Sequence, residues 1–230
     1  MDSIDGILLL DKPSGWTSFD VVAKVRGLVR RETGLKKPKV GHTGTLDPLA
    51  TGLLVLVVGK YTKRVPELSK VDKTYEVTMK LGQTSTTGDE EGEKSYVSDK
   101  KPSHEEVAAA LEKHQGEIEQ IPPAFSAIKV NGQRAYKLAR AGKEVVIGPR
   151  QVTIYGITDV SYAYPDIRFT AKVSSGTYVR TLVEDIGKAL GTGAYMSALR
   201  RTQVGDFLLI DACTIVGLSK QGPRDRLTII

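Results

Sequence analysis

The feature that most constrains this chain is a loop of small residues that runs directly into an apolar segment. Residues 41–52 read GHTGTLDPLATG, and the residues that follow, Leu53 to Val58, are all apolar. The three loop glycines permit strained or left-handed backbone angles, and Pro48 fixes the turn just after Asp47. The apolar run predicts a buried strand that makes the loop's platform rigid. We therefore expect the Asp47 carboxylate to be held outside any regular element, where it can act as a nucleophile or a base.

Composition excludes several classes of protein. The chain has 230 residues and one cysteine, Cys213, so it can form neither an intrachain disulfide nor a cysteine-built metal site. We expect Cys213 to be a small buried hydrophobe. The N-terminus lacks the basic flank of a signal peptide, and no apolar run approaches the length of a membrane span. These features predict a soluble, cytoplasmic protein that does not enter a membrane.

Basic residues are in excess and gather in two segments. There are 33 Lys and Arg residues against 27 Asp and Glu, a net charge of +6. One cluster precedes the loop and contains Arg30, Arg31, Lys36, Lys37 and Lys39. The second lies between residues 122 and 150 and contains Lys129, Arg134, Lys137, Arg140 and Lys143. Such clusters favour a polyanionic partner, and a solvated surface is the alternative.

Periodicity and capping signals predict a mixture of helices and strands. Thr17 and Asp20 have the spacing of a capping box, which predicts a helix to about Arg31. Residues 74–81 alternate strictly between apolar and polar, as in a half-buried strand. Further expected elements are strands at 7–10, 152–160 and 167–173 and helices at about 103–114 and 181–190. The segment 122–149, rich in glycine and basic residues, predicts an inserted hairpin or helical flap.

Because few βαβ units are present, the pattern predicts an α+β domain with an antiparallel or mixed sheet and helices packed on it. At the loop, the chain resembles the TruB family of tRNA pseudouridine-55 synthases, whose signature GHTGTLDPxATG occurs without a mismatch. The resemblance extends to GILLLDKPSGWTS (6–18), KTY (73–75), GQTSTTGDEEG (82–92), PPAFSAIKVNGQRAYKLARAG (122–142), SGTYVRT (175–181) and LRR (199–201). It implies the pseudouridine synthase fold, a mixed and mostly antiparallel sheet flanked by helices, with an RNA-binding flap inserted at about residues 122–150.

The resemblance also bears on domain organisation. Bacterial members of the family usually carry a small C-terminal RNA-binding (PUA-like) domain after the catalytic core. Here the chain stops at Ile230, which leaves too few residues for it. We therefore expect one catalytic domain, residues 1–230, without the PUA-like domain, and how its grip on tRNA would be compensated is open.

The activity implied by the resemblance is isomerisation of uridine 55 in the T loop of tRNA, with the target base flipped out. The family's essential aspartate corresponds to Asp47, which acts either as a nucleophile at C1′ or as the base that takes the 2′ proton; the sequence leaves both open. Asp11 and Asp89 lie in turn-like polar sequence and Asp185 falls within a predicted helix, so they are weaker candidates.

Other site residues are likewise implied by motif. Arg180 corresponds to the arginine that pairs with the catalytic acid and keeps it ionised. Tyr75 corresponds to the tyrosine that packs on the flipped base, although a core aromatic is the alternative. The remaining expected substrate-binding or supporting residues are His42, Tyr178, Leu199, Lys12, Lys129 and Arg134. We expect Lys12 to act through backbone or carboxylate contacts.

The reaction adds and removes nothing, so we expect no cofactor and no metal. A phosphate loop would need Gly-Lys-Ser/Thr after its glycines, and a zincin would need paired histidines on a helix; neither pattern occurs. The serious rival is a non-catalytic module that binds or folds the tRNA T arm. We expect a monomeric enzyme that acts on the T arm and T loop of tRNA. Replacing Asp47 distinguishes this enzyme from the non-catalytic module.

Overall fold

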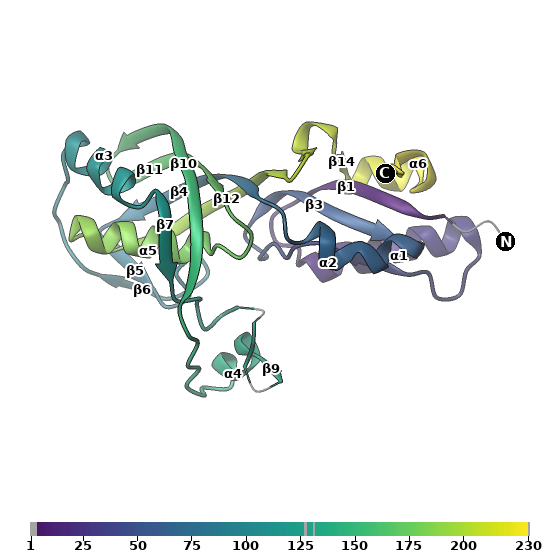
Figure 1. Cartoon of the computed structure of the whole chain (residues 1–230), viewed down its shortest axis with the longest axis horizontal. Helices are drawn as coiled ribbons and strands as arrows, with labels where there is room; N and C mark the ends of the chain where they lie inside the picture. The colour runs from purple at the N-terminus through teal and green to yellow at the C-terminus, as the bar shows by residue number, and fades with distance from the viewer. Residues whose placement is uncertain (1–3, 127, 131, 230) are drawn as a thin grey trace. The chain divides into compact units, whose positions relative to one another are not determined.

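The computed structural model describes residues 4–126, 128–130 and 132–229 (Figure 1). Its contacts divide the chain into two compact units, Met1–Glu76 with Leu199–Ile230, and Val77–Ala198. The sequence patterns did not predict this division. Strands β4 (Lys73–Leu81) and β12 (Ala194–Val204) each have residues in both units, so both chain crossings occur within strands.

The first unit is built around strand β3 (Thr51–Val58). Strand β1 (Gly6–Lys12) pairs with β3 antiparallel along nearly its whole length, and β14 (Cys213–Thr214) adds parallel to β1. Strand β2 (Val40–His42) pairs antiparallel and β12 pairs parallel with β3. The other elements of this unit are 3-10 turns at Gly59–Arg64, Leu209–Asp211 and Arg224–Arg226, strand β13 (Phe207–Leu208), and helices α2 (Val65–Leu68) and α6 (Ile215–Gln221).

Helix α1 (Ser18–Thr33) has both ends fixed by local sequence. Thr17 and Asp20 form the predicted capping box, and Gly34 ends the helix in the left-handed conformation with φ 72°. The buried face of α1, which includes Val21, Val25 and Val29, joins one hydrophobic cluster with alternate residues of β1 and β3. Cys213 belongs to the same cluster, as expected for a small buried hydrophobe.

The second unit consists of a sheet and two helices that contact each other. Its strands follow the order β12-β4-β11-β10-β7. Strand β10 (Arg150–Ala163) pairs antiparallel with β11 (Asp166–Val173) and with β7 (Gly116–Gln120). Helix α3 (His104–Lys113) contacts α5 (Val179–Leu190), and a separate hairpin joins β5 (Gln83–Ser85) to β6 (Lys94–Tyr96). The alternation predicted for residues 74–81 is confirmed, because every second residue of β4 is buried.

The segment between β7 and β10, residues 121–149, is called the insertion below. It contains the hairpin of β8 (Lys129–Val130) and β9 (Gln133–Arg134), followed by helix α4 (Ala135–Arg140). In Figure 1, β9 and α4 lie at the far end of a segment that leaves the sheet between β7 and β10. The sequence predicted a hairpin or a helix here, and the insertion contains both. Few of its side chains are buried, among them Ser126 and Ala135.

The predicted fold class, α+β with a mixed sheet and flanking helices, is confirmed by these elements. Antiparallel pairs join β3 to β1 and β2 and join β10 to its neighbours, while β14 and β12 pair in parallel with β1 and β3. None of the described helices combines the length and the apolar character that a membrane span requires.

Candidate active site

Asp47 lies in a loop that bridges a gap along one edge of β3. Because β1 occupies one edge of β3, strands β2 and β12 share the other edge. β2 pairs with β3 residues 56–58, and β12 pairs with Thr51 and Gly52. The chain leaves β2 after His42 and enters β3 at Thr51, and the intervening residues 43–50 are called the Asp47 loop below. Asp47 itself is in no helix or strand, as predicted.

The side chain of Arg201, on β12, fixes the start of this loop to β3. Its Nε donates to the carbonyl oxygen of Leu53 at 2.8 Å, and its Nη2 donates to that of Gly44 at 3.1 Å. Nη1 lies 3.5 Å from the carbonyl oxygen of Thr45. Arg201 is 2% exposed, and its rigid fork of donors allows one side chain to bind several carbonyl groups.

The rest of the Asp47 loop is held by residues of β1 and α1. Lys12 is fully buried, and its Nζ donates to the carbonyl oxygen of Pro48 at 3.2 Å and to two carbonyls in the turn between β1 and α1. Ser18 Oγ donates to the carbonyl oxygen of Leu46 and accepts from its N–H, each at 2.9 Å. The loop backbone is therefore bound on both sides of Asp47. Lys12 thus makes backbone contacts, one of the two kinds expected, and its role at the site stays a prediction.

Of the three loop glycines, only Gly52 has a left-handed backbone, with φ 97°. A Cβ on Gly52 would lie 2.3 Å from the carbonyl oxygen of Arg201, far inside van der Waals contact. The close pairing of β3 with β12 therefore requires glycine at this position. Gly41 and Gly44 have no positive φ, so they do not use the conformational freedom that glycine permits.

His42, at the end of β2, has a largely buried imidazole near Arg201. Burial lowers the pKa of His42, and the positive charge of Arg201 lowers it further. Its Nδ1 is buried and has no hydrogen-bond partner within the part of the chain that the structure describes. The exposed ring of Phe19 packs edge-on against it, with centroids 5.7 Å apart. A neutral imidazole with an unused ring nitrogen can bind a polar group of a substrate.

Lys73 adds a further buried cation to this unit. Its Nζ donates to the carbonyl oxygen of Ser69 at 3.1 Å and to that of Val71. Burial, assisted by the charge of Arg201, lowers the pKa of Lys73 to about 8. A Cβ on Gly44 would lie 3.8 Å from Lys73 Cε and 3.5 Å from Arg201 Nη1, so both cations approach the Asp47 loop. Together with Lys12 they create a positive potential behind the loop.

The sequence analysis gave Lys73 and Arg201 no role, although both fall in quoted motifs. Lysine and arginine are exposed by default, and hydrophobic periodicity treats them as surface residues. The only sequence signal was their place in the motifs of Tyr75 and Leu199, because Lys73 falls just before the predicted strand 74–81 and no strand was predicted around Arg201.

Tyr75 and Leu199 belong to the same unit as Asp47. Tyr75 is 8% exposed on β4, a degree of burial that fits both the core role and the base-stacking role considered from the sequence. Leu199 lies on β12, is half-buried, and accepts a hydrogen bond from Thr51 Oγ1 through its carbonyl oxygen at 3.4 Å. Their contact with substrate remains a prediction.

Asp11 is not in a turn, as its polar sequence context suggested, but within β1. Its carboxylate makes a two-pronged ion pair with Arg200: Nη2 to Oδ2 is 2.8 Å and Nη1 to Oδ1 is 3.2 Å. The Asp11 carboxylate is therefore engaged in an ion pair.

Arg180, in the first turn of α5, is buried in the second unit beside an acidic partner. Its Nη1 lies 3.4 Å from Asp89 Oδ2 and donates to the carbonyl oxygen of Thr87 at 3.0 Å. Its Nη2 donates to the carbonyl oxygen of Phe125, in the insertion, at 2.8 Å. Arg180 thus has a fixed orientation. Because Asp47 belongs to the other unit, its predicted pairing with Arg180 stays a prediction.

Asp89 is a site residue that the sequence analysis set aside as part of a turn. It forms an isolated β-bridge with Met196 and is 3% exposed. Its Oδ1 accepts hydrogen bonds from the Thr87 hydroxyl at 2.5 Å and from the Glu91 N–H at 3.1 Å. A carboxylate is buried only when its charge is compensated, and here Arg180 compensates it. Sequence periodicity carries no signal for such a pair.

Tyr178 immediately precedes α5, where buried Gln120 binds both of its backbone polar groups. Gln120 Oε1 accepts from the Tyr178 N–H at 3.1 Å, and Nε2 donates to the Tyr178 carbonyl oxygen at 3.3 Å. The guanidinium of Arg150 lies over the Tyr178 ring, 5.2 Å from its centroid. Tyr178 therefore presents a positioned aromatic ring close to Arg180 in sequence and in the same unit.

Lys129 and Arg134 lie directly opposite each other in the hairpin of β8 and β9. Both are exposed. Like charges at directly opposed positions destabilise a strand pair, so an anion bound beside them would relieve the repulsion. Within the described residues, no group of three or more His, Cys, Asp or Glu side chains could hold a metal ion.

Two adjoining family models match the chain. Residues 30–179 match the TruB family pseudouridylate synthase N-terminal domain, and residues 180–221 match the tRNA pseudouridylate synthase B C-terminal domain. The chain belongs to the TruB family. The resemblance inferred from the motifs is thereby confirmed, and TruB membership makes the chain a tRNA-modifying isomerase that forms pseudouridine.

Individual relatives agree. The tRNA pseudouridine synthase B of Cupriavidus metallidurans is 47% identical over 225 residues, which are 97% of this chain and 70% of the relative. Among solved structures, a Cbf5-Nop10-Gar1 complex gives a TM-score of 0.72 at 31% identity, covering 94% of this chain and 54% of that chain. An H/ACA RNP bound to a substrate RNA containing 2′-deoxyuridine gives a TM-score of 0.67 at 28% identity, covering 94% and 52%. The TruB chain thus spans about half the length of these solved chains.

Proposed function

We propose that this TruB family member converts uridine 55 in the T loop of tRNA to pseudouridine, with Asp47 as the reacting carboxylate. The observation that carries the proposal is the binding of the Asp47 loop backbone by Arg201 and Ser18 before Asp47 and by Lys12 after it. A reacting group must be held to within a fraction of an ångström, and buried side chains that bind the supporting backbone provide this.

The reaction breaks the bond between N1 of uracil and C1′ of the ribose, turns the base, and joins C5 to C1′. C5 also loses its proton and N1 gains one, so that nothing is added or removed overall. Asp47 can take part in these steps in two ways. As a nucleophile, the carboxylate displaces uracil from C1′, and C5 then displaces the carboxylate. As a base, it removes the C2′ proton while N1 departs, and the proton returns when C5 adds. Deuterium at C2′ of the target uridine distinguishes the roles, because only the base role predicts a primary kinetic isotope effect.

Arg180 is proposed to pair with Asp47 when RNA is bound and to keep the carboxylate ionised in a pocket that excludes water. Its three contacts, to Asp89 and to the carbonyls of Thr87 and Phe125, support this role because they orient the guanidinium in advance. A guanidinium presents five N–H donors in a planar fork, so it can bind more than one oxygen acceptor.

The target uridine must leave the helical stack to reach Asp47, and the protein has to replace the lost stacking. We propose Tyr75 as the aromatic partner of the flipped base, with Tyr178 and Leu199 in contact with the substrate. The buried Nδ1 of His42, which has no partner among the described residues, supports a polar contact from His42 to the RNA. Stacking on an aromatic side chain is worth about 1–3 kcal/mol per base, enough to offset much of the cost of flipping.

Contacts to the T arm are proposed to come from the insertion, as an RNA-binding flap within one catalytic domain. Lys129 and Arg134, opposed on the β8–β9 hairpin, present two positive charges on one side of the hairpin. Phosphate oxygens are the natural partners of such a pair. We further propose that the enzyme acts in the cytoplasm as a monomer.

The decisive test is Asp47→Asn, with Asp185→Asn as the matched control. The substitution keeps the shape of the side chain and removes the anionic oxygen, so pseudouridine formation at position 55 should fall by more than about a hundredfold. Affinity for tRNA should stay within about tenfold, since an uncharged amide of the same size and shape replaces the carboxylate. Carbodiimide mapping of the tRNA after single-turnover incubation measures pseudouridine formation, and filter binding measures tRNA affinity. Turnover by Asp47→Asn near the parent rate would exclude the assignment, and a parent that binds tRNA without modifying it would favour the binding-module alternative.

A further inference from the structure

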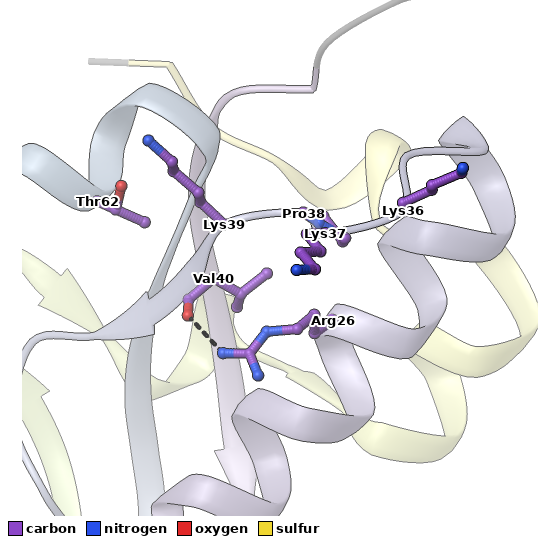
Figure 2. A pocket seen from close by; sticks show the side chains of 7 residues that line it. All are labelled: Arg26, Lys36, Lys37, Pro38, Lys39, Val40 and Thr62. Atoms are coloured by element: carbon purple, nitrogen blue, oxygen red, sulfur yellow. Dashed lines mark hydrogen bonds between the residues drawn. The ribbon is translucent and has the colours of Figure 1, made fainter.

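The first unit contains a basic pocket that the proposed reaction does not use. It is lined by Arg26, Lys36, Lys37, Pro38, Lys39, Val40 and Thr62 and has a volume of about 490 Å³ (Figure 2). That volume lies within the range of about 300–1,000 Å³ typical of ligand pockets. The lining includes four cationic side chains and no acidic one.

The path of the backbone creates this pocket. Helix α1 stops at Gly34, and the chain turns back through residues 35–39 to begin β2 at Val40. Arg26, two turns before the end of α1, reaches across the turn and donates from Nη2 to the carbonyl oxygen of Val40 at 3.2 Å. Figure 2 shows the Lys37 side chain on the side of the turn that faces Arg26, while Lys36 and Lys39 extend away in opposite directions.

The four cations are not neutralised by the part of the chain that the structure describes. None of Arg26, Lys36, Lys37 and Lys39 makes an ion pair with any described residue, whereas nearby Glu32 is engaged with Arg224 at 3.4 Å. The carbonyl end of α1 would attract cations, but this effect fades within the last helical turn. Arg30 and Arg31 already occupy that turn, and the lysines lie beyond Gly34. An unpaired cluster of like charge is destabilising on its own and favours a bound anion.

The pocket adjoins the strand that leads to Asp47. Val40 lines the pocket and begins β2, and His42 ends β2 at the start of the Asp47 loop. At about 3.4 Å of rise per strand residue, Val40 and His42 are about 7 Å apart. A nucleic acid strand whose target base reaches the Asp47 loop therefore passes within reach of the pocket.

We propose that this basic pocket binds phosphate groups of the RNA backbone, on the same tRNA whose uridine reacts. The inference rests on the proposed function for the identity of the RNA. Arg26, held by Val40, supplies fixed guanidinium donors, and Lys37 and Lys39 supply mobile ammonium groups. A phosphate is the group that accepts from both kinds of donor. The site would hold the RNA beside the reaction centre from the first unit, independently of the insertion.

The test compares Lys37→Ala/Lys39→Ala with the charge-matched control Lys24→Ala/Lys220→Ala, whose residues are exposed in the same unit. Affinity for unmodified tRNA is measured by filter binding over a series of salt concentrations. Each lost phosphate contact reduces the slope of log affinity against log salt by about 0.7–0.9, so the pocket variant should lose about 1.5 and the control much less. A third variant, Lys37→Arg/Lys39→Arg, keeps both charges and should retain most of the slope.

Equal slopes in the pocket variant and the control would overturn the proposal. Calorimetric titration with inorganic phosphate tests the other source of the same anion: a pocket variant that loses phosphate binding but keeps the parent's salt slope with tRNA would also overturn it. Failure of the proposed function appears separately, as a parent protein that forms no pseudouridine at position 55. In that case the difference between the pocket variant and its control still decides whether the pocket binds RNA.

Discussion

The Asp47 loop and the insertion both carry residues proposed to meet RNA, yet they are held in opposite ways. The Asp47 loop is bound by Arg201, Lys12 and Ser18, whose polar atoms are buried and directed at loop carbonyls. The insertion has mostly exposed side chains. Lys129 and Arg134 are exposed on a hairpin whose strands are two residues long. One region is fixed from behind by cations, and the other displays its cations outward.

This difference matches what each region has to do. A reacting carboxylate must meet one carbon or one proton with little error in position, so its support is rigid. Contacts to phosphates depend on charge more than on exact geometry and tolerate a surface segment. In the second unit, Arg180 is held rigidly beside buried Asp89 and also binds the Phe125 carbonyl at the start of the insertion.

The largest expected effect is on stability, from Arg201→Lys. Lysine cannot bind the carbonyls of Leu53 and Gly44 together, so at least one charge-assisted hydrogen bond is lost and a buried carbonyl is left without a donor. We expect a loss of about 3 kcal/mol in unfolding free energy, or about 6–12 °C in Tm by calorimetry. The control is Arg200→Lys, whose partly exposed pair with Asp11 should be worth less than about 1 kcal/mol. Similar losses in both variants would contradict the claim that the Asp47 loop is held by Arg201.

Arg180→Lys should reduce the rate more than it reduces stability. The charge remains, but lysine cannot contact Asp89, Thr87 and Phe125 while also facing Asp47. We expect a single-turnover rate about a hundredfold lower, equivalent to about 2.7 kcal/mol of transition-state stabilisation. Arg168→Lys, on the exposed side of β11, serves as the control. Normal turnover by Arg180→Lys would exclude the proposed pairing with Asp47.

A smaller effect, on binding alone, is expected from Lys129→Ala/Arg134→Ala in the insertion. If both side chains contact phosphates, the salt slope of tRNA affinity should flatten by about 1.5. Lys113→Ala/Arg168→Ala removes the same charges from exposed positions elsewhere in the second unit. A slope that stays at the parent value would mean that Lys129 and Arg134 do not bind RNA phosphates. The contrast between the insertion and the Asp47 loop would then have no functional meaning.

The smallest expected effect is on the pH dependence of stability, and it comes from His42, which lies just before the Asp47 loop. Because the folded-state pKa of His42 is depressed, the unfolded chain takes up a proton more readily than the folded one as the pH falls below about 6.5. Unfolding free energy should therefore decrease between pH 7.5 and 5.5, and His42→Gln should show less of this decrease. His104→Gln, at an exposed histidine, should keep the parent's pH dependence. Identical profiles for the two variants would show that His42 is not buried as a neutral ring.

Much of the fold followed from local signals in the sequence. The capping box at Thr17 and the strict alternation from residue 74 to 81 each act within a few residues, so α1 and β4 could be predicted without knowledge of distant contacts. Asp47 was found in the same way, because its motif is contiguous. The hairpin and helix of the insertion were both anticipated, although the sequence did not choose between them.

What could not be predicted depends on residues that meet only in three dimensions. Arg201 binds carbonyls about 150 residues away in sequence, and Arg180 pairs with Asp89 about 90 residues away. Buried cations such as Lys12 and Lys73 contradict the default placement of lysine at the surface, so periodicity assigns them wrongly. The division into two units was missed because it falls within β4 and β12, where the sequence has no linker.

Gly52 has a consequence for the assembly of β3 during folding. The strand is apolar on both faces, with Leu54 and Leu56 in one hydrophobic cluster and Leu53 and Val55 in another. A slip of one residue would exchange leucines and valines between two similar environments, so hydrophobicity alone discriminates weakly between alignments. At Gly52, however, any shifted neighbour would bring a Cβ into the Arg201 carbonyl. The residue without a side chain therefore fixes the register of the central strand. By fixing where β3 begins, it also sets the length of the loop that carries Asp47.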